Sequence, residues 1–163
     1  MVIQEKVRKA LNKQINAELY SSYLYLAMAA YFEAKSLLGF ANWFKVQSRE
    51  ENTHAMKFYE YIVERGGKVS LTAIEAPKTE WKSALDAFEE AYTHELKVTG
   101  MIYDLGKLAK SESDYATESM LKWFIDEQVE EEANASLIVE KLKMIKDSAN
   151  GILMLDHELG ERK

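Results

Sequence analysis

Apolar residues recur at alternating spacings of three and four along four long stretches of the chain. This spacing places them on one face of an α-helix, because three and four bracket the helical repeat of about 3.6 residues. The stretch 66–80 loses this period: it opens with Gly66-Gly67, a strong helix stop, and contains Pro77. The pattern predicts helices at about 4–35, 38–65, 81–110 and 114–146, and a short apolar helix at 152–159 after a turn at Asn150-Gly151.

The lengths of the connections predict how these helices are arranged. Short turns join the first helix to the second and the third to the fourth, so each pair should run antiparallel. The connection 66–80 is long enough to traverse a bundle about 40 Å long, at roughly 3.3 Å per extended residue. We therefore predict an all-α fold, a four-helix bundle with one long crossover and a short fifth C-terminal helix, in a single domain over residues 1–163.

The composition agrees with long helices and excludes several other classes of protein. Seven glycines and one proline are too few for the turns of a multistranded β fold. No stretch of about 18 apolar residues is free of charge, so we expect no contact with a membrane interior. The net charge of −6 disfavours nucleic acid as a partner, since such binding depends on neutralising phosphates. The absence of cysteine excludes disulfides and thiolate ligands and indicates a cytoplasmic protein.

Ionisable residues interrupt the apolar faces near the midpoint of each long helix. In an antiparallel bundle these midpoints lie at one height, so the side chains should converge in the core. Buried carboxylates without partners cost several kcal/mol each, and four of them would remove most of a domain's stability of about 5–15 kcal/mol. Bound cations are therefore expected to compensate them. The converging residues are Glu18, Glu51, His54, Glu95 and Glu131.

The ligand types indicate which cations these residues would bind. Carboxylate oxygens with one imidazole suit iron or manganese, and the set exceeds the four ligands of a structural zinc site. Two ions about 3.5–4 Å apart that share a bridging glutamate would use all of the ligands. Glu51 and His54 lie on one helix face at positions i and i+3, and Gln128 and Glu131 repeat that spacing.

With these residues in place, the chain resembles a non-haem ferritin of the bacterial and archaeal type over its whole length. The segments that carry the resemblance are QINAELYSSYLYLAMAAYFE, EENTHAMKFYEYI, ERGGKV and WFIDEQVEEE. The resemblance implies a ferritin-like bundle with a ferroxidase centre. Its first iron would bind Glu18, Glu51 and His54, and its second iron would bind Glu51, Glu95 and Glu131, with Gln128 beside it. A third iron would bind Glu50, Glu127, Glu130 and Glu131.

The resemblance also implies an activity and an assembly. Fe²⁺ would be oxidised by dioxygen or peroxide and stored as a ferric mineral inside a homo-oligomeric shell of 24 subunits. We assign catalytic roles to Tyr25, an aromatic residue beside the centre, and to Gln128, which should leave the second iron weakly held. Trp123 matches a second aromatic residue of the family near the centre.

Departures from related families narrow this interpretation. Bacterioferritins place a haem-ligating methionine directly after the bridging glutamate, where this chain has Asn52, so we expect no haem. They also carry a second Glu-x-x-His motif, whereas Glu131 is followed three residues later by Asn134. Two alternatives remain open: a di-iron oxidoreductase that acts on peroxide or an organic substrate, and a helical bundle that binds no metal.

Overall fold

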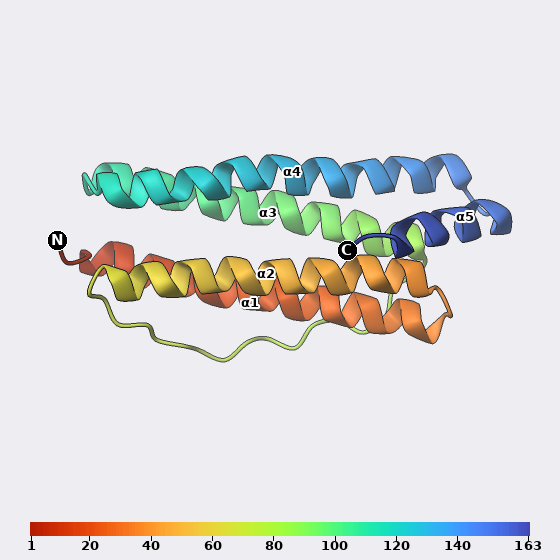
Figure 1. Ribbon diagram of the computed structural model, residues 1–163, viewed down its shortest axis with the longest axis horizontal. Helices are drawn as coiled ribbons and strands as arrows, with labels where there is room; N and C mark the ends of the chain where they lie inside the picture. The colour runs from red at the N-terminus through yellow and green to blue at the C-terminus, as the bar shows by residue number, and fades with distance from the viewer.

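Five helices and no strand make up the computed structural model, which describes residues 1–163. The predicted all-α bundle with a long crossover and a short fifth helix is confirmed (Figure 1). None of the helices has the combination of length and apolar character needed to span a membrane. The helices are α1 (Glu5–Ala34), α2 (Leu38–Glu64), α3 (Ala84–Ser111), α4 (Tyr115–Ile145) and α5 (Ala149–Gly160).

The two antiparallel pairs, α1 with α2 and α3 with α4, lie side by side in Figure 1. The connection between α2 and α3 runs along the outside of the first pair, from one end of the bundle to the other. Two asparagines of α1 hold this extended segment. Asn12 donates to the carbonyl oxygen of Lys68 at 3.1 Å, and Asn16 donates to that of Ala73 at 3.0 Å.

Side-chain caps lie at the starts of α3, α4 and α5, where Ser83, Asp114 and Ser148 each accept a hydrogen bond from a backbone nitrogen of the first turn. Ser83 accepts a hydrogen bond from the backbone of Asp86, so α3 begins at Ala84, three residues later than its apolar period indicated. Ser148 caps α5 in the same way. The predicted turn at Asn150-Gly151 is wrong, because both residues lie in the first turn of α5. Gly151 is needed for close packing instead: a Cβ atom there would lie 2.6 Å from a methyl carbon of Ile145.

The apolar core is divided into two clusters along the bundle. The first surrounds closely packed rings of α1, α2 and α3, with Phe44 only 4.7 Å from Phe88 between ring centroids. The second lies toward the other end and includes Phe58 stacked on Phe124 at 4.0 Å. The layer between the two clusters contains buried polar residues, and packed aromatic rings on both sides restrict how those side chains can move.

The short helix α5 docks against the start of α2. The carboxylate of Asp156 accepts hydrogen bonds from the backbone nitrogens of Gly39 and Phe40, at 2.9 and 3.0 Å. These nitrogens belong to the first turn of α2, where helices lack internal acceptors. A Cβ atom on Gly39 would lie 1.6 Å from the carbonyl oxygen of Asp156, so only glycine permits this approach. The far end of α5 is thereby directed toward the middle of α2.

Candidate metal centre

All four long helices contribute to the polar layer between the two apolar clusters. α1 contributes one residue, α2 two, α3 one and α4 two, and none of these side chains is more than 4% exposed. Each is near the middle of its helix, so the predicted convergence at one height is observed. The residues are Glu18, Glu51, His54, Glu95, Gln128 and Glu131.

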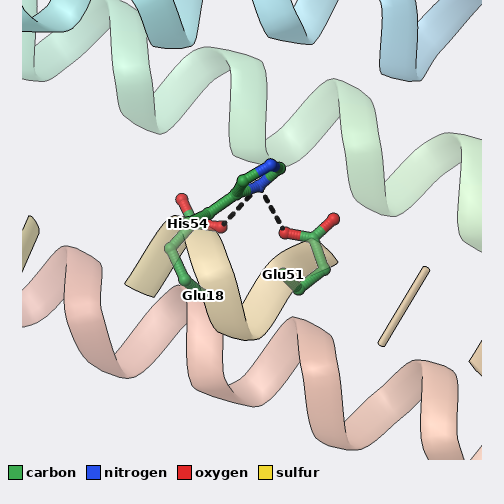
Figure 2. Close-up of side chains that lie close together, drawn as sticks. All are labelled: Glu18, Glu51 and His54. Atoms are coloured by element: carbon green, nitrogen blue, oxygen red, sulfur yellow. Dashed lines mark hydrogen bonds and ion pairs between the residues drawn. The ribbon is translucent and has the colours of Figure 1, made fainter. Parts of the chain in front are cut away.

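Their ligand atoms form two groups that share one glutamate. Atoms of Glu18, Glu51 and His54 lie within 4.8 Å of one another, and so do atoms of Glu51, Glu95 and Glu131. Figure 2 shows the His54 ring between the carboxylates of Glu18 and Glu51. Its Nδ1 atom is 3.1 Å from an oxygen of Glu51 and 4.0 Å from one of Glu18. The arrangement suits two adjacent cations bridged by Glu51.

No lysine or arginine forms an ion pair with the four buried glutamates. Their partners are side-chain amides, the Tyr25 hydroxyl and His54, and burial lowers the pKa of His54 to about 4, so its ring is neutral near pH 7. One oxygen of Glu18, Oε2, has no hydrogen-bond partner at all. A buried carboxylate oxygen without a donor is costly. The carboxylate and imidazole ligands of this layer therefore suit metal cations that bind from solution.

Burial raises the pKa of every glutamate in this layer. The pKa of Glu18 is raised to about 7, and burial together with the charge of Glu95 raises that of Glu131 to about 8. Burial, Glu95 and Glu18 raise the pKa of Glu51 well above its ordinary value. Without metal, the site therefore retains protons near neutral pH. Incoming cations must displace these protons, which couples metal binding to pH.

The two residues assigned to catalysis both contact Glu95. The hydroxyl of Tyr25 donates to a carboxylate oxygen of Glu95, and burial raises the pKa of Tyr25 well above its usual value, which keeps the hydroxyl protonated. The amide nitrogen of Gln128 donates to the other oxygen of Glu95 at 3.1 Å and to Thr99 at 3.1 Å. Both side chains thus orient Glu95 in the layer where cations would bind.

The glutamates predicted to bind a third iron are not gathered into one group. Glu127 is half-buried, with an oxygen 3.8 Å from Nε2 of His54, and it forms a possible ligand group with His54 and Glu131. Glu130 is exposed and Glu50 forms an ion pair with Arg162, and neither belongs to any of the three possible ligand groups. The ring of Trp123 packs edge-on against His54, with 5.4 Å between centroids.

Two glutamines that hold the glutamates were not assigned a role from the sequence. Gln14 donates to Glu18 at 2.8 Å, and Gln47 donates to Glu51 at 3.3 Å and also to Glu131. The sequence contains a pattern that predicts these contacts, because each glutamine precedes its glutamate by four residues on the same helix face. Such contacts orient ligands and are typical of the surroundings of metal sites.

The sequence of this chain is similar to sequences of known proteins over nearly its whole length. The family model of the ferritin-like domain matches residues 8–145. The chain is 43% identical over 161 residues to a bacterial non-heme ferritin of Staphylococcus saprophyticus, covering 99% of this chain and 96% of that protein. It is 44% identical over 161 residues to a bacterial non-heme ferritin of Bacteroides fragilis, covering 99% and 100%.

The fold of this chain is also similar to the folds of solved structures. An open pore ferritin from the hyperthermophilic archaeon Archaeoglobus fulgidus superposes with a TM-score of 0.98, at 52% sequence identity over 99% of each chain. An engineered closed form of the ferritin from that archaeon has a TM-score of 0.98 and 53% identity, over 99% of this chain and 98% of the other.

Proposed function

This chain belongs to the ferritin family, and we propose that it stores iron by oxidising Fe²⁺ to Fe³⁺ at the two cation positions that share Glu51. The observation that carries the proposal is the layer of four buried glutamates without a lysine or arginine partner, one of which has an oxygen with no hydrogen-bond partner. Cations are the partners that such a layer requires. The oxidised iron is then deposited as a ferric mineral inside an oligomeric shell.

The ligand set explains why oxidation is favoured. Hard anionic oxygens stabilise Fe³⁺ more than Fe²⁺, so these carboxylates lower the reduction potential of the bound iron. Two adjacent ions deliver two electrons together to the oxidant, which we propose is dioxygen or peroxide. The first position has the imidazole of His54 and two carboxylates, whereas the second has carboxylates and the amide of Gln128. This asymmetry favours weaker binding at the second position, as transit of iron into a mineral requires.

We propose three finer features of the function. Tyr25 and Gln128 act on the reaction through their hydrogen bonds to Glu95. A third iron binds Glu127 and Glu131, which lie together beside His54, and Glu50 and Glu130 complete its ligands from the surface. The protein contains no haem and works in the cytoplasm.

We also propose that 24 copies form the shell. Exposed apolar residues near the junction of α4 and α5 support such an assembly, since large apolar patches mark contact surfaces. These residues are Met144, Leu153 and Met154, which are 77%, 60% and 74% exposed.

The test is iron loading followed by size-exclusion chromatography. Metal-free protein is given Fe²⁺ and air in increments, and the particle mass and the iron content of each fraction are measured. A large particle that contains ferric mineral supports iron storage. A small oligomer with a fixed number of iron ions would support a di-iron oxidoreductase instead, and a protein without iron would support a structural bundle.

A matched pair of variants ties the activity to the site. Glu51→Ala removes the shared ligand and should abolish rapid Fe²⁺ oxidation while circular dichroism still reports the helical fold. Glu140→Ala removes an exposed carboxylate of α4 and should oxidise iron at the parental rate. Normal oxidation by the Glu51 variant would contradict the proposed centre.

A further inference from the structure

Arg162, just beyond the end of α5, reaches across to α2 beside the metal centre. Its Nη2 atom donates to the side-chain oxygen of Gln47 at 2.9 Å and to Glu50 at 2.9 Å. Its Nη1 atom donates to the carbonyl oxygen of Trp43 at 3.1 Å, and the guanidinium carbon lies 4.5 Å from the centre of the Trp43 ring. The planar guanidinium is thus held by acceptors along one face of α2 and by an indole ring.

The backbone that carries this arginine is held as well. The side-chain amide of Asn42 donates to the carbonyl oxygen of Arg162 at 2.8 Å and to that of Leu159 at 3.2 Å. The Arg162 side chain is only 21% exposed. Because backbone and side chain are both anchored on α2, the arginine loses little further freedom when it donates to Gln47.

Gln47 lies between the arginine and two glutamates of the metal layer, and it is only 1% exposed. Its amide nitrogen donates to Glu51 at 3.3 Å and also to Glu131, while its oxygen accepts from Arg162. A guanidinium can only donate and an ionised carboxylate can only accept, so one of the two orientations of the amide suits both sides and the other suits neither. Arg162 therefore keeps the amide nitrogen, and not the oxygen, directed at the glutamates.

The contacts of Gln47 lie on the side of the second cation position. Oε1 of Glu51 accepts from Gln47, whereas Oε2 of the same carboxylate is the atom 3.1 Å from His54. Glu131, the other partner of Gln47, is in the ligand group of the second position and not in that of the first. The effect of Arg162 on the glutamates should therefore be concentrated at the second position.

We propose that Arg162 is a positioning residue for the second cation: through Gln47 it fixes the carboxylates of Glu51 and Glu131 that bind the cation there. The inference rests on the proposed function, which supplies the two cations. Hydrogen bonds to metal ligands orient those ligands before an ion arrives, and their loss typically lowers metal affinity. Arg162 is 115 residues from Gln47 in sequence, so the docking of α5 takes part in forming the metal centre.

The role can be measured with Zn²⁺, which binds without being oxidised. The assembled, metal-free parent, Arg162→Met, Gln47→Met and the double variant are titrated calorimetrically with Zn²⁺. Methionine keeps much of the length of either side chain but removes its donors and acceptors. Lys141→Met, which removes an ion pair between α4 and α5, to Glu158, is the matched control. Arg162 belongs to neither apolar cluster, so its variants should retain the bundle, which circular dichroism checks.

We expect Arg162→Met to bind the second Zn²⁺ about threefold to tenfold more weakly, and Gln47→Met about tenfold more weakly. The first Zn²⁺ should change by less than about twofold, because Glu18 is held by Gln14 instead. In the double variant, loss of Arg162 should add less than about twofold to the effect of Gln47→Met, since the arginine acts through that glutamine. Arg162→Lys, which retains a donor, should recover part of the loss, and the control should match the parent.

Anomalous diffraction from crystals soaked in limiting Zn²⁺ assigns the two ions to their positions. In Arg162→Met, the occupancy beside Glu95 and Glu131 should fall relative to that beside His54. Unchanged affinity for the second ion, an equal loss at both positions, or losses that multiply in the double variant would each overturn the inference and leave the proposed function standing. A parent protein that binds no pair of ions at Glu51 would refute the proposed function itself, so the two failures are distinguishable.

Discussion

Without metal, the protein should lose stability as the pH rises from 6.5 to 8. Burial and Glu95 raise the pKa of Glu131 from 4.5 to about 8, and burial raises that of Glu18 from 4.5 to about 7. At pH 6.5 the unfolded chain has already lost these protons, whereas the folded chain still holds them. These groups therefore favour folding most at low pH, and their contribution disappears as the pH rises through the folded pKa values.

Two histidines oppose this trend below pH 6.5. Burial lowers the pKa of His54 and of His94 from 6.5 to about 4, so between these values the unfolded chain binds two protons that the folded imidazoles do not, and this contribution alone makes stability rise with pH. Above pH 6.5 the histidines are neutral in both states and only the carboxylates contribute. A proton that only the folded chain holds lowers the free energy of unfolding by about 1.4 kcal/mol for each unit that the pH rises. Glu131 alone therefore accounts for a loss of about 2 kcal/mol between pH 6.5 and 8.

Thermal unfolding of the metal-free protein at one fixed concentration measures this loss, because Tm in an oligomer depends on concentration. A loss of about 2 kcal/mol corresponds to roughly 4–8 °C in Tm for a chain of this size. Glu131→Gln should flatten the dependence, whereas Glu140→Gln, a change at an exposed carboxylate, should leave it unaltered. Excess Zn²⁺ should reverse the slope, since metal competes with the protons. Stability that stays level or increases from pH 6.5 to 8 in the metal-free parent would refute the reasoning.

Three further changes probe separate parts of the molecule. Tyr25→Phe removes a hydroxyl donor to Glu95 and should slow Fe²⁺ oxidation about tenfold in stopped-flow assays; an unchanged rate would exclude the assigned role. Glu130→Ala leaves all ligands of the first two ions in place, so the initial rate should stay within severalfold of the parent while the iron consumed per oxidant changes; if neither quantity moves, Glu130 is only a solvated residue. Asp156→Ala removes the cap of α2 and should lower the free energy of unfolding by about 1 kcal/mol in urea titrations, a loss that Asp156→Asn should partly restore.

The sequence alone determined the bundle and the buried layer of the site. The period of three and four defines one face of each helix, and the connection lengths define which helices run antiparallel. Together these place Glu18, Glu51, Glu95 and Glu131 at one height in the core. The convergence was predictable because it depends only on helix geometry and on the midpoint of each segment. The Asn150-Gly151 turn signal was weaker information, and it misplaced the start of the fifth helix, which begins at Ala149.

Only the tertiary structure decided which carboxylates at the edge of that layer are buried and which residues they contact. Glu127 lies near His54, Glu130 is exposed, and Glu50 is bound by Arg162, which is 112 residues away in sequence. The sequence spacing of Glu127 and Glu130 places both near the boundary of the buried face. Which of two such residues points inward depends on how α4 is rotated against its neighbours. The contact of Arg162 depends further on how α5 docks, and that docking follows from the close approach of two backbones at Gly39. Helical periodicity specifies the direction of a side chain on its own helix, but the packing of several helices specifies what it meets.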